Sequence, residues 1–245
     1  MVICTTNNMR VITRCGYPKL SLIKEKTDVW DGNDWVSIST ETHNSQSAFI
    51  RVCFLDGSYV ELDENTIVEL HSKTKKRAAD IKTGDAITSF DFLFHGNSPT
   101  ITTDYNDPIY KKGNKMGLAS EHDLEKILSE KISLEGMQML IYGWADKYGG
   151  HLIGKRETLE LLQISIRRYG INCTCITGSD EMSNLFISEK NIDIFGLGNG
   201  VKFNFYQKLK NSCQKVLSVK KCKHPKVVEI SGTSSIVLNN VCVRT

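Results

Sequence analysis

The pattern of hydrophobic and polar positions predicts short strands at both ends of the chain and helices in the middle. Between residues 48 and 60, apolar and polar positions alternate around Asp56-Gly57. An Asp-Gly pair between two such runs predicts a β-hairpin, because both residues tolerate positive φ. Residues 9–13 with the turn at Cys15-Gly16 predict a second hairpin, and residues 227–243 return to a strand-like composition.

The middle of the chain follows a different pattern. Residues 92–117 carry scattered Gly and Pro among polar residues without periodicity, which is typical of a linker. Three amphipathic patterns then predict helices, the first capped by Ser120 and the second by Ser133. The expected helices span residues 120–132, 134–146 and 158–169, and expected strands follow at 171–177, 185–188 and 201–206.

The order of these elements predicts a mostly β host interrupted by an α+β insert. The expected boundaries place the host at residues 1–92 and 218–245, with a linker and the insert at 93–217. With 245 residues and 40% hydrophobic content, the chain is long enough to bury a core in each part.

The composition bears on the cellular location of the protein, on the state of its cysteines and on its charge. The chain has no apolar run of about 18 residues and no apolar signal segment at its start. We therefore expect neither membrane insertion nor secretion, and a cytoplasmic location. The eight Cys are scattered, which favours reduced thiols over a disulfide framework. A net charge of +3 does not mark the whole chain as a polyanion binder.

Several blocks of sequence keep the order and outline of one known family. They are Cys4, Met9–Leu20, Val29–Trp35, Ala78–Ile87 and Val237–Thr245. These blocks resemble inteins, self-excising domains of the Hint fold, and the third looks like the corresponding stretch of inteins in ribonucleotide reductase large subunits. The resemblance implies a horseshoe-like, mostly β Hint fold whose two chain ends are neighbours. It also implies autocatalytic protein splicing, flanking host-protein segments as partners, and no cofactor for the Hint part.

The resemblance also assigns the splicing residues. Cys4 is the thiol that attacks the preceding carbonyl. Asp63 and Thr66 stand where the family has the Thr and His of a T-x-x-H block, and Arg244 and Thr245 stand where it has a His and the cyclising Asn. Threonine cannot transfer a proton near neutral pH as imidazole can, and no succinimide forms without a terminal side-chain amide. We therefore expect defective splicing, while slow N-terminal self-cleavage through Cys4 stays open.

The second predicted helix carries Leu140–Gly149, which resembles the LAGLIDADG motif of homing endonucleases. Gly143, Asp146 and Gly149 match the motif, but Tyr148 stands at the position of its metal-holding acid. A phenol with a reference pKa of about 10 is a poor ligand for Mg²⁺. Asp146 is the alternative metal ligand, although two residues along a helix turn its side chain by about 200°. DNA cleavage is therefore expected to be lost, and Mg²⁺ is expected only if the enzyme is active.

The single copy of the motif implies a homodimer, since a nuclease of this kind needs two cleavage centres. The alternative interpretation is an amphipathic packing helix without a function of its own. Basic residues near the end of the insert and beyond it either contact double-stranded DNA or form an ordinary solvated face. These residues are Lys208, Lys210, Lys215, Lys220 and Lys221.

Three functions stay open at this point. An active self-processing element requires a proton-transfer group near Cys4, and His71 could supply it only through a change of register from Thr66. A non-catalytic DNA-binding module and a decayed element without either activity are the other two. Whether the chain is an enzyme is therefore left undecided by the residues, and no zinc site is expected from its Cys and His.

Overall fold

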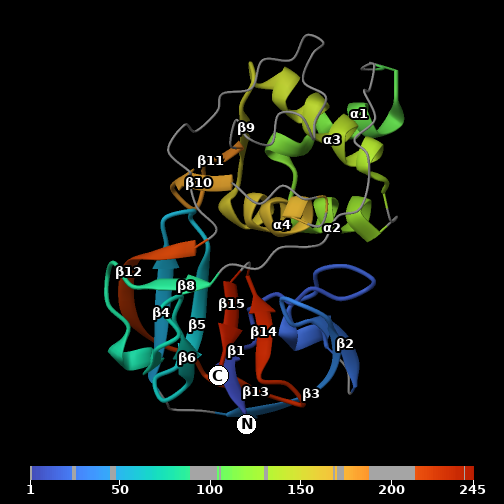
Figure 1. Ribbon diagram of the computed structural model, residues 1–245. Helices are drawn as coiled ribbons and strands as arrows, with labels where there is room; N and C mark the ends of the chain where they lie inside the picture. The colour runs from blue at the N-terminus through green and yellow to red at the C-terminus, as the bar shows by residue number, and fades with distance from the viewer. Residues whose placement is uncertain are drawn as a thin grey trace. The chain divides into compact units, whose positions relative to one another are not determined.

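The computed structural model describes residues 2–23, 26–44, 48–88, 104, 106–129, 132–167, 169, 174–187, 213–239 and 241–245 (Figure 1). The chain divides into two units. Unit 1 combines Met1–Asp91 with Asn211–Thr245, and unit 2 is Phe92–Lys210. The second boundary lies before the sequence-based one at 217/218, because the strand that begins at Cys213 belongs to the sheet of unit 1.

Unit 1 is built on an eight-stranded sheet of order β2-β3-β13-β1-β5-β4-β12-β8, with two two-stranded sheets, β14-β15 and β6-β7. Two 3-10 turns, Leu20–Leu22 and Ala78–Asp80, complete it among the described residues. The strands are β1 (Ile3–Thr6), β2 (Thr27–Trp30), β3 (Trp35–Asn44), β4 (Ala48–Phe54), β5 (Tyr59–Asp63), β6 (Ile67–Glu69), β7 (Lys75–Arg77), β8 (Ala86–Thr88), β12 (Cys213–Lys223), β13 (Lys226–Ser231), β14 (Ser235–Leu238) and β15 (Val241–Arg244).

Both predicted hairpins are confirmed. Strands β4 and β5 pair antiparallel around Asp56-Gly57, where Gly57 has a φ of 80° and the Asp56 carboxylate accepts hydrogen bonds from Ser58. The turn at Cys15-Gly16 is closed by a hydrogen bond of 2.8 Å from Thr13 N to the Gly16 carbonyl. Its two arms are joined by isolated bridges rather than by regular strands.

Strand β1 joins the two segments of unit 1. It pairs antiparallel with β13, placing Cys4 opposite Glu229, and on its other side it pairs with β5 through Thr5 and Leu62. In Figure 1 the blue β1 accordingly lies beside the red β13. Apolar side chains from both segments form one buried core, among them Ile3 and Val243. The expectation that the two ends of the chain belong to one β fold is therefore met.

Unit 2 contains helices and a small sheet. Its three-stranded sheet has the order β10-β11-β9. The elements are α1 (Pro108–Gly113), a 3-10 turn at Met116–Leu118, α2 (Glu121–Ser129), α3 (Leu134–Lys147), β9 (Leu152–Gly154), α4 (Arg156–Arg167), β10 (Thr174–Gly178) and β11 (Ser183–Ile187). None of the helices in the described part of the chain is long and apolar enough to span a membrane.

The linker predicted at residues 92–117 is wrong over its last part, which forms α1. The Asp107 side chain accepts hydrogen bonds from the backbone N–H groups of Ile109 and Tyr110, and Pro108 occupies the first turn. An acidic cap followed by Pro is a standard helix start, and this signal was available in the sequence. The strand predicted at 201–206 lies outside the described residues.

The helix starts predicted at Ser120 and Ser133 are confirmed. Ser133 Oγ accepts a hydrogen bond of 3.1 Å from Gly136 N. Ser120 and Asp123 cap each other: Asp123 N donates to Ser120 Oγ, and Ser120 N donates to the Asp123 carboxylate at 2.9 Å. These hydrogen bonds from Ser120 hold the pKa of Asp123 below its usual range.

Helices α1 and α3 pack with their backbones in direct contact. A Cβ atom at Gly143 would overlap the carbonyl oxygen of Tyr110, and one at Gly113 would overlap the carbonyl oxygen of Leu140. All residues of α3 from Gly136 to Ala145 are buried. The glycine face of the motif helix is therefore covered by α1 of the same chain, and it is not an open surface for a second copy.

This packing predicts that an added methyl group destabilises the protein more at Gly143 than at Gly136, although both glycines belong to α3. Gly143→Ala should destabilise the protein by roughly 1–3 kcal/mol, because neither backbone can move away without loss of packing. Gly136→Ala is the matched control: its Cβ would lie 3.1 Å from Cδ1 of Ile109, the end of a flexible side chain. This variant should stay within about 1 kcal/mol of the wild type. Urea unfolding measures both, and equal stabilities would contradict the close packing.

Candidate functional site

Cys4 lies in the middle of the sheet of unit 1, on the face opposite the core. Side chains alternate along a strand, so Ile3 and Thr5 face the core while Cys4 and Thr6 face away from it. Thr66, which is 7% exposed, donates a hydrogen bond of 3.3 Å from Oγ1 to the carbonyl of Cys4. The structure therefore brings two of the predicted splicing residues, Cys4 and Thr66, into direct contact.

Acidic side chains surround the thiol. Burial, together with the negative charges of Glu229 and Asp63, raises the pKa of Cys4 above its ordinary value. Each of these effects disfavours the thiolate, which is the nucleophilic form of cysteine. Burial and the neighbouring carboxylates therefore favour the protonated thiol of Cys4.

No histidine in the described part of the chain hydrogen-bonds to Cys4. The nearest link is indirect: His43 Nε2 lies 3.9 Å from Glu229 Oε2 and 3.5 Å from Glu41 Oε2. His71 is exposed, and its backbone N–H donates to the Ala86 carbonyl at 2.8 Å. In this register Thr66, and not His71, lies at the carbonyl of Cys4.

The predicted C-terminal residues lie at the end of the β14-β15 hairpin. Arg244 is paired with Ser235. Thr245 donates to the Ser234 carbonyl from its backbone N at 2.9 Å and from Oγ1 at 3.2 Å. The neighbouring Val243 is fully buried. These contacts fix the last residues in the same unit as Cys4, without placing an amide side chain at the terminal position.

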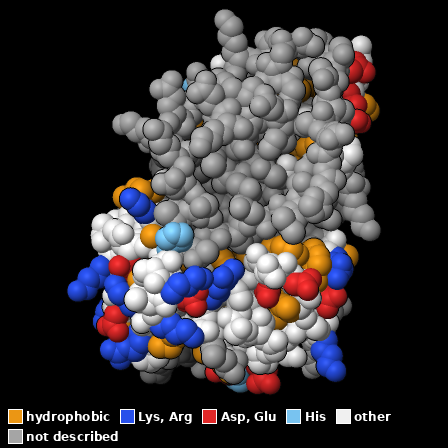
Figure 2. Space-filling view, in the orientation of Figure 1, with side chains coloured by type: hydrophobic (Ala, Val, Ile, Leu, Met, Phe, Trp, Pro, Cys, Tyr) orange, Lys and Arg blue, Asp and Glu red, His pale blue; other side chains and the backbone are white. Residues whose placement is uncertain are grey.

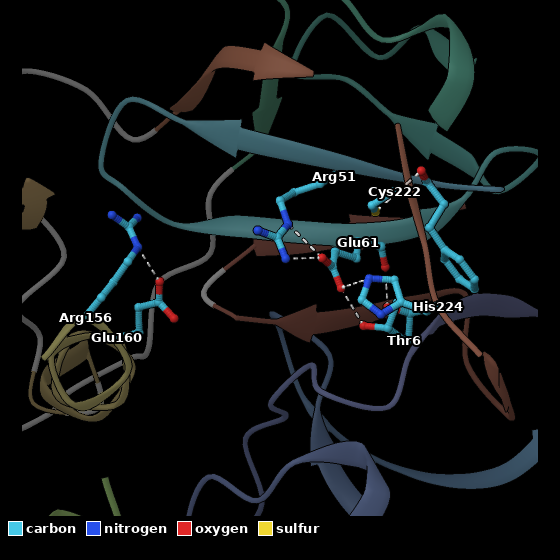
Figure 3. A network of polar contacts seen from close by, with 9 residues as sticks. Thr6, Arg51, Glu61, Arg156, Glu160, Cys222 and His224 are labelled. Carbon is cyan, nitrogen blue, oxygen red and sulfur yellow. Dashed lines mark hydrogen bonds and ion pairs between the residues drawn. The ribbon is translucent and has the colours of Figure 1, made fainter. Parts of the chain in front are cut away.

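A buried carboxylate that sequence reasoning missed lies on the same sheet face as Cys4. Glu61 is 1% exposed, and Figure 3 shows Arg51, Thr6 and His224 pointing toward its two oxygens. Arg51 Nε donates to Oε1 at 2.7 Å, while Thr6 Oγ1 donates to Oε2 at 2.7 Å. His224 Nε2 lies 3.2 Å from Oε2. The sequence feature that indicates this buried carboxylate is an acidic residue, Glu61, between the apolar residues of β5.

Cys222 completes this polar group on β12. Its thiol donates to the Phe49 carbonyl at 3.5 Å. Burial, with the charge of Glu61, raises the pKa of Cys222, although Arg51 acts in the opposite direction. His224 directly follows β12, and one possible ligand atom each from Cys222, His224 and Glu61 lie within 4.8 Å of one another. No zinc site is expected from the Cys and His of the sequence, yet the structure brings these two residues together with Glu61.

In unit 2, the carboxylate of Asp146 accepts a hydrogen bond of 2.6 Å from the Tyr110 hydroxyl. Asp146 belongs to no group of three or more possible ligands among the described residues. Tyr148 packs on Gly117, where a Cβ atom would overlap its ring. Burial of the neighbouring Tyr142 raises the pKa of that phenol to about 12. Nothing in this geometry supplies the second carboxylate that a hard cation prefers.

The predicted DNA-binding lysines divide between two places. Lys215, Lys220 and Lys221 are exposed on β12, which belongs to unit 1, so Lys215 does not lie in the insert as its expected boundary implied. Lys208 and Lys210 lie outside the described residues. Figure 2 shows the basic side chains of unit 1 interspersed with acidic ones on the face in view. Such a mixed surface has no continuous positive field for a polyanion.

A hollow within unit 2 gathers lysines that the sequence did not single out. It has a volume of about 810 Å³ and is lined by α1, α2 and the end of α3. The apolar part of its wall includes Met116 and Ile127. The polar lining comprises Lys112, Asn114, Lys115, Asp123, Lys126, Lys147 and Tyr148.

Comparison with known proteins gave structural similarities only. No protein-family model matches the sequence. No curated protein matches it either. The gp41-1 intein aligns over 100% of this chain and 99% of its own at 7% identity, with a TM-score of 0.44. The DnaX mini intein from Spirulina platensis aligns over 99% of both chains at 8% identity, with a TM-score of 0.43. The Ssp DnaB mini-intein variant M86 aligns over 99% and 98% at 9% identity, with a TM-score of 0.44.

The acidic surroundings of Cys4 predict a pH-dependent reactivity. Because its pKa is raised, the rate of Cys4 alkylation by iodoacetamide should reach half-maximum at a higher pH than that of a free cysteine. Glu229→Gln should shift this midpoint to lower pH by removing one negative charge. Glu41→Gln, which removes an exposed carboxylate from β3, is the control and should leave it unchanged. Mass spectrometry of the labelled peptide measures both, and an unshifted midpoint in Glu229→Gln would refute this account.

Proposed function

We propose that unit 1 is an intein-like self-processing domain in which Cys4 attacks the carbonyl of Ile3. The observation that carries the proposal is the position of the Ile3–Cys4 peptide in β1, between β13 from the C-terminal segment and β5, with the Thr66 hydroxyl on the Cys4 carbonyl. In this arrangement a nucleophile and its peptide are held in a rigid sheet, and holding reactants in place supplies much of the rate of an intramolecular reaction.

The proposed step is an acyl shift from nitrogen to sulfur. The Cys4 thiol loses its proton, the sulfur bonds to the Ile3 carbonyl carbon, and the bond from that carbon to the Cys4 nitrogen breaks. The nitrogen takes up the proton and becomes a free amine, so the product is a thioester. A general acid at the leaving nitrogen accelerates such a step by about 10²-fold or more, and Thr66 does not titrate in the required range.

The later steps of splicing are proposed to be blocked. In inteins, the last step needs an Asn side-chain amide that cyclises and a His before it. Thr245 and Arg244 stand at these two positions by resemblance, and neither a hydroxyl nor a guanidinium performs that chemistry. The reaction then stops at the thioester, which an added thiol opens with release of the N-terminal flank. The proposed outcome is a Cys4-dependent, slow N-terminal cleavage without ligation of the flanks.

This proposal predicts thiol-induced cleavage of a fusion that carries a reporter protein before residue 1. Dithiothreitol at mildly alkaline pH should release the reporter slowly, as measured by intact mass. Cys4→Ala should abolish release, and Cys15→Ala, which removes an exposed thiol, should leave it unchanged. Thr66→His should accelerate release about tenfold or more, because it supplies the missing acid. Release from Cys4→Ala, or no release even from Thr66→His, would rule the reaction out.

A second function is proposed for unit 2, supported by the hollow lined with lysines. We infer that the LAGLIDADG-like insert binds double-stranded DNA through this hollow without cleaving it. Four lysines around one concave wall attract a phosphate backbone, since neutralised phosphates release counterions.

Tyr148 at the position of a metal-holding acid argues against Mg²⁺-dependent cleavage. The glycine contact between α1 and α3 argues against a homodimer through the motif helix.

The DNA-binding proposal predicts a salt dependence that individual lysines change. Lys115→Gln should lower the slope of log affinity against log salt concentration by about 0.9 for duplex DNA. Lys111→Gln is the matched control, because Lys111 belongs to α1 but not to the wall of the hollow. Fluorescence anisotropy at several salt concentrations measures the slopes. Equal slopes for the two variants, or strand scission in Mg²⁺, would count against the proposal.

A further inference from the structure

We propose that Glu61, Cys222 and His224 form a binding site for a divalent metal ion of the zinc class. Each of the three residues offers one ligand atom, and these atoms all lie within 4.8 Å of one another. A carboxylate oxygen, a thiolate sulfur and an imidazole nitrogen are the donors from which zinc sites in proteins are built. Mg²⁺ and Ca²⁺ prefer oxygen donors alone, so this mixed set selects a softer ion.

The geometry of the strands brings the three donors to one face of the sheet. Cys222 lies near the end of β12 and His224 directly follows that strand, and their donor atoms lie within 4.8 Å of each other. Glu61 projects from β5, with β4 between the two strands. The register of the sheet pairs Cys222 with Phe49 of β4, and the Phe49 ring packs edge to face against His224 at a centroid distance of 5.7 Å.

The separation of two donors already fits a shared ion. His224 Nε2 lies 3.2 Å from Glu61 Oε2. Two ligands bound tetrahedrally at about 2.0–2.1 Å are roughly 3.3 Å apart. A cation between them would replace the direct contact of nitrogen and oxygen without a change of side-chain position. Cys222 Sγ would give up its hydrogen bond to the Phe49 carbonyl and become the third ligand.

Neighbouring groups hold the carboxylate in a suitable orientation. Arg51 binds Glu61 Oε1, which leaves Oε2 directed toward His224. Thr6 donates to the same Oε2 and fixes its position from β1. Groups of this kind, which orient a ligand without touching the metal, are a regular feature of protein metal sites. Thr6, Glu61 and Arg51 come from the neighbouring strands β1, β5 and β4, and Figure 3 shows their side chains meeting at the Glu61 carboxylate.

The same contacts also describe a polar cluster without a metal, in which His224 and Glu61 form an ion pair beside Arg51. The two readings differ in the role of Cys222. In a simple ion pair the thiol contributes nothing to the charge balance, whereas a metal displaces its proton and, when His224 is charged, a second proton from the ring. Binding must therefore strengthen as the pH rises, and it must depend on the thiol.

Three protein ligands leave the fourth tetrahedral position to water. The site connects β5, in the segment before the insert, with β12, in the segment after it. An ion bound here would tie together two parts of unit 1 that are far apart in the sequence, and ligands that bind only the folded state stabilise it. Cys4 is not among the three ligands, so the site is separate from the proposed self-processing residue.

Titration of the full chain with Co²⁺ tests the site, because cobalt reports thiolate ligation by a charge-transfer band in the near ultraviolet. The wild type should show this band at one equivalent, and Zn²⁺ should displace it. Cys222→Ser should remove the band. Cys53→Ser removes a partly exposed thiol of the neighbouring β4, and Cys4→Ser removes the proposed nucleophile, so both should keep the band unchanged.

His224→Gln is a second variant that tests the site if Cys222→Ser does not fold. Circular dichroism checks the fold of each variant. Loss of a group that only orients a ligand already weakens metal binding about 10–100-fold, so loss of this proposed ligand should weaken Co²⁺ binding by at least about tenfold. Zn²⁺ should raise the thermal midpoint of the wild type and not that of His224→Gln. The proposal is overturned if the wild type shows no band, if the band survives in Cys222→Ser, or if it vanishes in Cys53→Ser or Cys4→Ser.

Discussion

The pairing of β1 with β13 is the interaction on which unit 1 depends. It connects residues near the start of the chain with residues beyond the insert, and Cys4 gains its neighbour Glu229 only through this pairing. The hydrogen bonds of an inner strand are satisfied from both sides, here by β13 and β5. Ile3 and Val243 then share one core, so the two segments fold as one unit although they are separated by the whole of unit 2.

The outer face of this sheet is unusually acidic for the surroundings of a nucleophile. Asp63 and Glu229 stand near Cys4, and Glu61 stands one strand away, fully buried and balanced by Arg51 and His224. An unpaired buried carboxylate would be costly, which explains why so many donors converge on Glu61. The consequence differs for the two thiols. Burial and the nearby carboxylates favour the protonated form of Cys4, whereas Cys222 lies next to two potential metal ligands.

Local signals in the sequence predicted the local structure well. The Asp56-Gly57 turn and the Ser133 cap were readable because both depend on neighbouring residues alone. The Asp107-Pro108 start of α1 is equally local, although the scattered Gly and Pro around it indicate a linker. The order of the sequence blocks aligns Thr66 with a residue that acts beside Cys4, and its hydroxyl hydrogen-bonds to the Cys4 carbonyl.

Other features could not be read from the sequence, because they arise between strands that are distant along the chain. The assignment of Lys215 to the insert failed since strand pairing, not composition, puts β12 into the first unit. The cluster at Glu61 depends on the register of four neighbouring strands, β1, β5, β4 and β12. Gly143 matched a family motif, yet only the structure shows that α1 of the same chain occupies its face.

The central claim is that β1 lies between β13 and β5. Backbone nuclear Overhauser effects in the isotopically labelled protein measure this pairing directly. The account predicts contacts between Cys4 and Glu229 and between Thr5 and Leu62 in the same sample. Absence of the Cys4–Glu229 contact, with the β4–β5 hairpin intact, would show that the N-terminal strand pairs elsewhere and would contradict the arrangement of the site.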